Sequence, residues 1–452
     1  MGNNRIIADL GNATRLAAAS GSALVNFLQS GTGAVARTLQ AKMRDVVNVD
    51  DFGAVGNDTA DDTAAITAAT TAVSAAGGGV VHYTYGKTYK ITAALPLLIG
   101  VRHEGYGAII KQYTGNIPIF KAPTGVVTQK WSILGLKLRY NTQQTIAQTG
   151  AASILLADGG SSYDWVIRDV QTEFANEGIK APATASSFAF VGVIESYTAF
   201  SCTNWAIDME CLTGGYTNIS VTNAWALQLN GAGLTGSKGF RFKNGSMLRL
   251  NSMFADHITG QFMDINTCTG SIGEVTLEGG SFSQTTAGVL ILVGMANSPM
   301  IVNSLKFVGV SFTTTGAGEI YMFRPTSTGT DVAIKVRYFA SDGCLSSGST
   351  IYEVAPGGTG IRVYNETAVL NRTVNLGDFA VLKKIRVWNG DVRVSQEGGK
   401  AHIYGTAAPV AETWAVGDIV WNTSPTAGGT IGFVCTTAGT PGAWKTFGAV
   451  AA

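Results

Sequence analysis

The sequence predicts an all-β solenoid, in which short strands form coils that stack on one another. Only 13% of the 452 residues are charged and 57 are Gly, a composition that suits short strands separated by tight turns. Strand-like segments recur from about residue 97 to 345, at spacings of about 20–35 residues. Two of them, VTLEGGSF (275–282) and LKFVGVSF (305–312), are near copies, as expected for coils that bury their apolar faces against neighbours. A β-sandwich with irregular strands is the alternative, and the near copies argue against it.

The first 45 residues are rich in Ala, Leu and Gly and poor in aromatic residues. We expect helices near 13–29 and 34–46 in this segment. The second of these helices carries an apolar stripe formed by Val35, Leu39, Met43 and Val46. Helices of this length are marginally stable alone, so we expect them to need packing partners.

Residues 46–66, VVNVDDFGAVGNDTADDTAAI, predict a strand, a turn and a helix in that order. A strand is expected over 46–49, and Gly53 and Gly56 provide the backbone freedom that a tight turn requires. A helix is expected from about 61 to 76, and three consecutive Gly residues end it. Its apolar face comprises Ile66, Ala69, Val73 and Ala76.

Acidic residues gather just before this helix, at Asp58, Asp61 and Asp62. Their spacing falls short of a calcium-binding loop. Thr59 and Asp62 instead match a capping box, in which side chains bond the free N–H groups of the first helical turn. We therefore expect no metal site here, and no cofactor elsewhere in the chain.

The segments DFGAVGNDTADDTAAI (51–66) and GGGVVHYTYGKTYKITAALPLLIGVRHEGYGAIIK (77–111) resemble the start of the pectate-lyase-like right-handed β-helix of bacteriophage tailspikes and polysaccharide depolymerases. Upstream, SGTGAVARTLQAKMRDVVNV (30–49) is similar to the neck that joins such spikes to a virion. The resemblance implies a right-handed parallel β-helix in a homotrimer. It divides the chain into a virion-attachment neck, a β-helix, a β-rich trimer-contact region and a C-terminal β-module, over residues 1–45, 46–345, 346–400 and 401–452.

The same resemblance implies a function: a tailspike in the phage virion, made in the host cytoplasm, that binds and cleaves a bacterial surface polysaccharide (capsule or O-antigen) during host adsorption. Residues 1–45 are then expected to contact phage tail or adaptor proteins. A non-catalytic receptor-binding spike is the alternative. A cellular pectin-lyase-like enzyme is disfavoured, because MGNNRIIADLGNATRL at the N-terminus lacks the pattern of an export signal.

Composition narrows the set of partners further. A net charge of +1 gives no reason to expect nucleic acid, and no apolar run approaches the length of a membrane span. The five Cys residues, an odd number without CxxC pairs, are expected to be buried and reduced.

Cleavage of a glycan by hydrolysis needs two carboxylates, whereas a lyase needs a base and a group that neutralises a uronic acid. The best pair is Asp208 and Glu210 in WAIDMECL, because residues two apart on a strand share a face. We expect both to face outward while the residues between and beside them face the core. Glu173 and Glu177 in QTEFANEGIK are the second candidates, and a surface ion pair is the plainer explanation for them.

Other carboxylates are weaker candidates. Asp256, His257 and Asp264 form one group, although adjacent residues on a strand point to opposite sides. Glu274 and Glu278 share a face, where a structural ladder is the favoured role.

Aromatic side chains cluster in the same region as the first two carboxylate pairs, and sugar rings stack on such faces. The candidates for glycan binding are Tyr163, Trp165, Tyr197, Trp205, Tyr216 and Trp225. Packing in the core is the favoured explanation for most of them. Three further tryptophans, Trp414, Trp421 and Trp444, fall in the C-terminal module, where packing is again favoured over carbohydrate contact.

Overall fold

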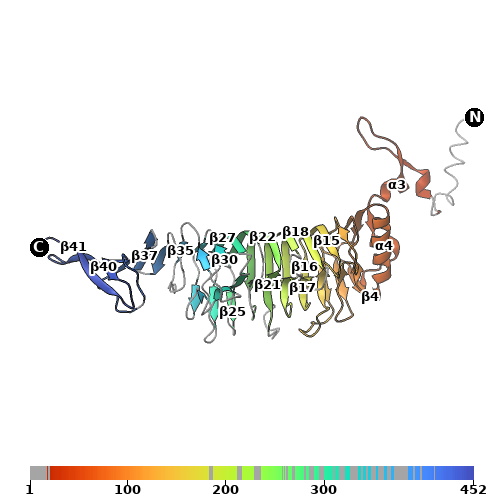
Figure 1. The fold of residues 1–452 in the computed structure, drawn as a ribbon. Helices are drawn as coiled ribbons and strands as arrows, with labels where there is room; N and C mark the ends of the chain where they lie inside the picture. The colour runs from red at the N-terminus through yellow and green to blue at the C-terminus, as the bar shows by residue number, and fades with distance from the viewer. Residues whose placement is uncertain are drawn as a thin grey trace, which may run out of the picture.

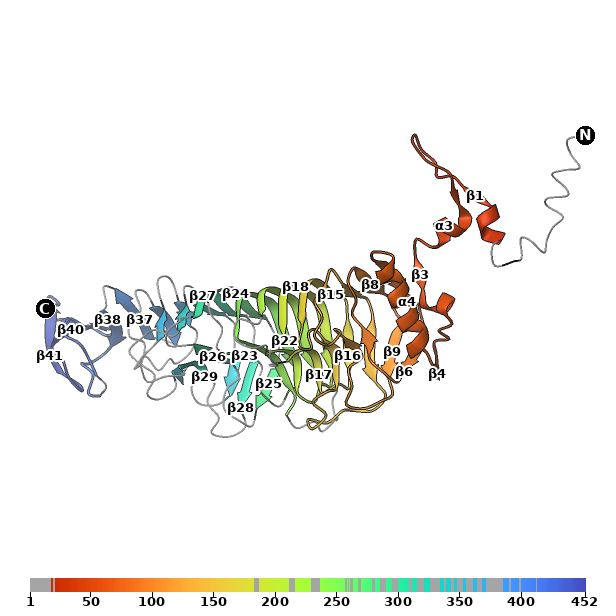
Figure 2. The same ribbon diagram turned by 45° about the vertical axis from the view of Figure 1, so that its right-hand side comes forward.

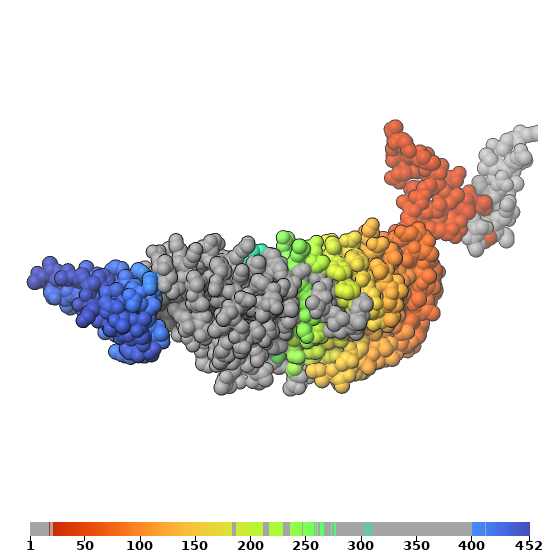
Figure 3. Space-filling view, in the orientation of Figure 1, coloured from red at the N-terminus to blue at the C-terminus, as the bar shows by residue number. Residues whose placement is uncertain are grey.

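The computed structural model describes residues 18, 21–182, 187–210, 216–228, 236–256, 258, 260, 400–411 and 413–452, together with the strands named below between 263 and 397. The molecule is elongated, with helix α4 (Thr63–Ala75) at one end of a stack of strands and strands β40 and β41 near the other end (Figure 1). In the space-filling view, the coils from α4 to β22 form one continuous body (Figure 3).

Parallel strands stack into a β-helix, as the sequence predicts. Each coil contributes one strand to a ten-stranded sheet, and these strands begin 25 to 33 residues apart. The ten strands are β7 (Leu95–Pro96), β10 (Phe120–Lys121), β14 (Ala152–Leu155), β17 (Glu177–Ala181), β19 (Trp205–Met209), β21 (Lys238–Lys243), β23 (Met263–Asn266), β26 (Leu290–Gly294), β29 (Tyr321–Pro325) and β33 (Glu353–Val354). The side of the coils opposite this sheet is formed by a second, larger sheet (Figure 2).

The larger sheet contains the remaining strands of the coils. In its first part these are β3 (Val47–Asn48), β4 (Asn57–Asp61), β5 (Gly79–His82), β6 (Thr88–Ile91), β8 (Val101–Glu104), β9 (Ile109–Gln112), β11 (Thr128–Gln129), β12 (Ser132–Leu134), β13 (Lys137–Tyr140), β15 (Ser161–Arg168), β16 (Gln171–Glu173), β18 (Phe188–Phe200), β20 (Tyr216–Leu227) and β22 (Gly245–Asp256). They continue as β24 (Gly270–Glu278), β25 (Ser281–Gln284), β27 (Met300–Val308), β28 (Ser311–Thr314), β30 (Ile334–Val336), β31 (Phe339–Asp342), β32 (Leu345–Ser347), β34 (Ile361–Val363), β35 (Ala368–Leu370) and β36 (Ile385–Asn389).

The two near copies in the sequence lie on top of each other. In the pairing of β24 with β27, Val275 and Leu305 are backbone register partners, and in the pairing of β25 with β28, Phe282 and Phe312 are. Parallel pairing continues past residue 345, because β35 still pairs in parallel with β36.

The long strands bend at residues in the left-handed backbone region. Asp164, Val191, Asn218 and Met247 occupy equivalent positions in successive coils, with φ between 48° and 58°. A second column of such residues, with φ between 51° and 55°, contains Asp169, Ser196, Asn223 and Ser252. These columns are the corners at which the sheet turns around the core, since a left-handed residue redirects a strand locally.

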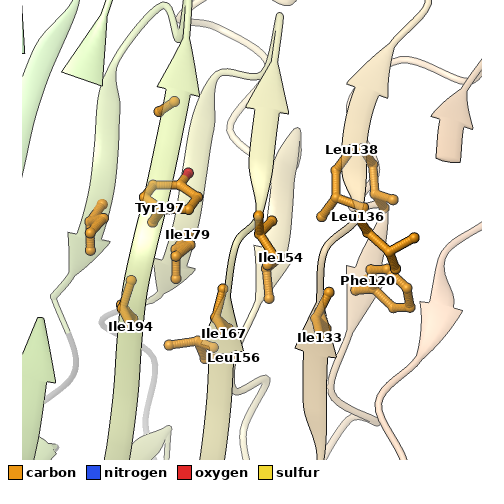
Figure 4. Packing of buried hydrophobic residues seen from close by; sticks show 14 of the residues in the cluster. Phe120, Ile133, Leu136, Leu138, Ile154, Leu156, Ile167, Ile179, Ile194 and Tyr197 are labelled. Carbon is orange, nitrogen blue, oxygen red and sulfur yellow. The ribbon is translucent and has the colours of Figure 1, made fainter. Parts of the chain in front are cut away.

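Apolar residues of equal register fill the interior in columns. Ile133, Ile167 and Ile194 follow one another along the larger sheet, and Ile154 and Ile179 along the smaller (Figure 4). All five are fully buried. His103 occupies the same column as Ile133, where its Nδ1 bonds the Tyr83 hydroxyl at 3.0 Å, and burial lowers the pKa of this imidazole to about 3. Burial therefore keeps it neutral at physiological pH.

Helix α4 covers the first coil, but its start differs from the sequence prediction. Ile66, Ala69 and Val73 are buried as expected, whereas Ala76 is exposed. Asp62 is the N-cap residue, yet its carboxylate accepts bonds from the backbone N–H of Val55 and Gly56, so the expected capping box is wrong. The carboxylate therefore fixes the preceding turn and makes no hydrogen bond to the N–H groups of the helix.

The segment before the β-helix is less helical than expected. A 3-10 helix η1 (Gly21–Leu24) and two short strands, β1 (Asn26–Phe27) and β2 (Arg37–Thr38), precede α3 (Leu39–Met43). The helix predicted over 13–29 is thus contradicted at β1, and its first part lies outside the described residues. The helix predicted over 34–46 is reduced to α3, because the backbone of Arg37 and Thr38 pairs with β1 instead. None of the helices in the described part of the chain is long and apolar enough to cross a membrane.

The C-terminal strands form a small module with mainly antiparallel pairing. They are β37 (Val392–Glu397), β38 (Lys400–Gly405), β39 (Ile419–Asn422), β40 (Thr430–Thr437) and β41 (Ala443–Ala449). The rings of Trp414 and Trp444 meet edge to face at 5.4 Å, and Trp421 meets Phe447 in the same way. The three tryptophans therefore pack on other rings of their own module.

Candidate functional site

A column of charged residues crosses four consecutive strands on the outer face of the ten-stranded sheet. Lys180 of β17 pairs in register with Asp208 of β19, which pairs with Arg241 of β21, which pairs with Asp264 of β23. Their side chains share one face because each occupies the same register position between core residues. We call these residues and their neighbours the charged ladder; the neighbours are Glu177, Trp205, Glu210, Lys238 and Lys243.

Arg241 is the centre of the charged ladder. Its Nε and Nη2 donate to the two carboxylate oxygens of Asp208 at 2.7 and 2.6 Å, and Nη2 also donates to Glu210 at 2.9 Å. Lys243 donates to the other oxygen of Glu210 at 2.9 Å. One guanidinium therefore bonds two carboxylates, with a bidentate geometry toward the first of them, and Lys243 supplies the second positive charge.

This arrangement corrects part of the prediction for Asp208. The side chain does lie on the face opposite the buried Ile207 and Met209, but the residue is only 1% exposed. Because Asp208 is buried and bonded to Arg241 through both of its oxygens, its carboxylate is not accessible to a substrate. Its role in the structure is to position Arg241, whereas Glu210 is half-buried and lies nearer to solvent.

The other end of the ladder contains Glu177, the member of the second predicted pair that lies here. Its carboxylate accepts from Lys180 at 2.5 Å and from Asn204 at 3.2 Å. Trp205 is 2% exposed, with Lys238 and the Arg241 guanidinium 5.1 and 5.3 Å from its ring centroid. The predicted role of Trp205 as an exposed sugar platform is therefore wrong, because two cations cover it.

The carboxyl groups of the charged ladder differ in the direction of their pKa shifts. Burial raises the pKa of Asp264 to about 6, against the opposing effect of Arg241 and Lys243, and one of its oxygens has no hydrogen-bond partner among the described residues. Burial also raises the pKa of Glu177. For Glu210, burial acts upward, but the Lys243 hydrogen bond and the Arg241 charge outweigh it and lower the pKa. Near pH 6 the site therefore offers both a protonated carboxyl group and an ionised one.

A second cluster lies on the side of the coil formed by β13, β16, β18, β20 and β22. Trp225 of β20 is 38% exposed, and its ring lies 4.5 Å from that of Phe254, its register partner in β22. Phe200 and Leu227 are register partners on the same face and are half-buried. We call Phe200, Trp225, Leu227 and Phe254 the aromatic strip.

Glu173 belongs to the aromatic strip side and not to the charged ladder. It faces Phe200 in register and lies beside the basic residues of β13. Its carboxylate meets Lys137 at 2.6 Å and Arg139 at 3.4 Å, and accepts from Gln171 at 2.7 Å. The predicted pair of Glu173 and Glu177 is thus divided between two sides of the coil by the corner at Phe174, whose φ is 64°.

Two of the predicted aromatic contacts lie in the core. Trp165 is fully buried and stacks on Trp131 at 5.8 Å, and the buried Tyr197 hydroxyl bonds Thr172 at 2.8 Å. Both were candidates for glycan binding, with packing in the core as the other explanation, and both occupy inward register positions. Tyr163 stacks on Phe190 at 5.0 Å, outside the aromatic strip.

Several predicted residues lie outside the described side chains. These are Tyr216, His257, Glu274 and Glu278, and the cysteines Cys211, Cys268 and Cys344. The remaining cysteines, Cys202 and Cys435, are buried and free of disulfides.

The basic residues of both clusters were missed. Lys180, Arg241 and Arg139 lie in segments that read as ordinary strands. Their alignment with the acidic residues follows from coils of unequal length, so no fixed sequence spacing brings them together. The sequence indicates these basic residues only through the alternation of each charged residue with apolar core residues along its own strand.

The architecture is that of a β-helix protein, and solved structures share it. No family model matches the sequence, and no curated protein matches it. The tailspike protein of E. coli bacteriophage HK620 in complex with a pentasaccharide has a TM-score of 0.53 and 12% identity, over 79% of this chain and 71% of that chain. A double mutant of that tailspike protein also has a TM-score of 0.53, with 11% identity over 83% of this chain and 66% of that chain. A further variant has a TM-score of 0.52 and 9% identity, over 96% and 98% of the two chains. The chain therefore shares the fold of a phage tailspike.

Proposed function

We propose that this protein is a phage tailspike that binds a bacterial surface polysaccharide during host adsorption. Its fold is shared with a tailspike whose structure contains a pentasaccharide, which supports a glycan as the ligand. Assembly as a homotrimer, a place in the virion, and attachment to phage tail or adaptor proteins through residues 1–45 are parts of the same proposal.

The aromatic strip carries this proposal. Trp225 exposes its ring on a flat outer face and is supported from the next coil by Phe254. A rigid aromatic face of this kind offers large contact area at low entropic cost, and a sugar ring can lie against it. Strands of the β-helix hold the rings, so the binding face is preformed.

Replacing Trp225 by Ala is expected to weaken binding to the host polysaccharide by about tenfold or more, because the loss of a well-packed aromatic contact commonly costs more than 1 kcal/mol. Binding of the purified protein to capsule or O-antigen, followed by calorimetry, measures the effect. Tyr85→Ala is the matched control, since Tyr85 is 80% exposed but belongs to the first coils. Unchanged affinity of Trp225→Ala would remove the aromatic strip as the binding face.

We propose cleavage of the polysaccharide as a second activity, supported by the separated pKa values in the charged ladder. Asp264 is suited to protonate a leaving oxygen, and Glu210 to act as the ionised base or nucleophile. Arg241 would orient Glu210, and Asp208 would orient Arg241. In a hydrolase, water completes the reaction; in a lyase, the base removes a sugar proton and no water is added.

Asp264→Asn and Glu210→Gln are each expected to lower cleavage at least 100-fold while retaining binding, because each removes one half of the acid–base pair. The rate should also fall as pH rises through about 6, the pKa of Asp264, since a general acid must be protonated. Release of reducing ends, with ultraviolet absorbance of unsaturated uronic acids, distinguishes hydrolase from lyase. Full binding with neither signal, even in the wild type, would identify a non-catalytic receptor-binding spike.

A further inference from the structure

Arg139 has unused hydrogen-bonding capacity beside the aromatic strip. Its guanidinium lies 4.8 Å above the ring of Phe174, and its side chain is 37% exposed. Within the part of the chain that the structure describes, it donates no hydrogen bond, and its nearest carboxylate oxygen, on Glu173, lies 3.4 Å from Nε. A planar guanidinium fixed on an aromatic ring keeps its outer N–H groups oriented for an incoming ligand.

The charges around Arg139 compensate it only in part, because it shares its carboxylate partner with Lys137. Glu173 carries one negative charge and already has a short contact, at 2.6 Å, with Lys137 and a hydrogen bond from Gln171. In the preceding coil Lys111 is the register partner of Arg139, and it is paired with Asp58 at 2.8 Å. Lys137 and Arg139 therefore share the single negative charge of Glu173, and a net positive charge remains at this end of the face.

Resting on the proposed function, we infer that the bound polysaccharide is acidic and that Arg139 binds the carboxylate of one of its sugars. A guanidinium matches a carboxylate with two parallel N–H···O bonds, which are stronger than bonds to neutral hydroxyl groups. A neutral glycan would supply acceptors but would leave the excess charge of this end unbalanced.

The geometry allows one glycan chain to contact both features. Arg139 lies in β13, and Trp225 and Phe254 lie in β20 and β22 on the same side of the coil. Five parallel strands cover this distance, which is about 19 Å at the usual strand separation. A glycan running along the axis of the β-helix would meet Arg139 at one end of this face and the aromatic strip at the other.

The test compares a host capsular polysaccharide with the same polymer after chemical reduction of its carboxyl groups. We expect reduction to weaken binding to the wild type about tenfold or more, in line with the strength of a charge-assisted hydrogen bond. Arg139→Gln should bind both polymers equally and at the weaker level, and Arg139→Lys should recover only part of the difference because it lacks the fork of donors. Arg102→Gln is the control, since Arg102 is more exposed but lies on another side of the coil.

Two results would overturn the inference. The first is equal affinity of the wild type for native and reduced polymer; if Trp225→Ala still weakens binding in that case, the proposed function stands and only the acidic ligand is wrong. The second is a change in the molar mass of Arg139→Gln by light scattering, which would show that this face contacts a second copy of the chain. Loss of the Trp225→Ala effect would instead count against the proposed function.

Discussion

Replacing Arg241 by Met is expected to lower the free energy of unfolding by about 3–5 kcal/mol, the usual cost of leaving a buried charge without its partner. Asp208 is 1% exposed, and both of its oxygens bond this one guanidinium. Glu210 would keep Lys243, so the loss falls mainly on Asp208. Denaturant unfolding, followed by circular dichroism, measures the change.

A double variant separates the charge effect from a packing effect. Asp208→Leu combined with Arg241→Met should recover most of the lost stability, because an apolar pair of similar size often replaces a buried ion pair without cost. Arg168→Met is the matched control: its partner Glu195 is as close, at 2.6 Å, but both side chains are more than 40% exposed, so a loss of about 1 kcal/mol or less is expected. Equal losses for Arg241→Met and Arg168→Met would show that burial does not determine how much the Asp208–Arg241 ion pair contributes to the free energy of unfolding.

The β-helix itself could be predicted from the sequence because its repeats are local. The copies at 275–282 and 305–312 fall into register with each other, and the region from about 97 to 345, where strand-like segments were expected to recur, forms coils of short strands. The local predictions that proved wrong concern places where contacts with other segments of the chain decide the structure. The expected capping box was lost because Asp62 bonds the backbone of a turn, and the helix over 34–46 was shortened because β2 pairs with β1.

The candidate site was predictable only in its acidic half. Alternation along β19 correctly separates Asp208 and Glu210 from the core residues, but it does not tell a solvated outer face from one covered by Arg241. Trp165 illustrates the same limit. The sequence does not tell whether this aromatic residue points inward or outward, whereas the structure shows it stacked on Trp131 beneath Gly192.

Gly192 is the residue that makes room for Trp165, and Gly192→Ala is expected to lower the free energy of unfolding by about 3 kcal/mol, at the upper end of the usual cost of overpacking a core. A Cβ at this position would lie 2.1 Å from the Trp165 ring, which is fully buried and rigid. Neither group has space to move, because Trp131 holds the ring from the other side.

Gly273→Ala is the control within a strand of the same sheet, since among the described residues its added Cβ would meet nothing closer than 3.7 Å. A second variant, Trp165→Leu, should make the Gly192→Ala change less costly, because the smaller side chain vacates the space that the new methyl group needs. Thermal unfolding of the two single variants and the double variant gives this coupling directly. Purely additive losses would mean that the strand at Gly192 shifts away from the Trp165 ring. The contact between Gly192 and this ring would then not determine the distance between the two coils.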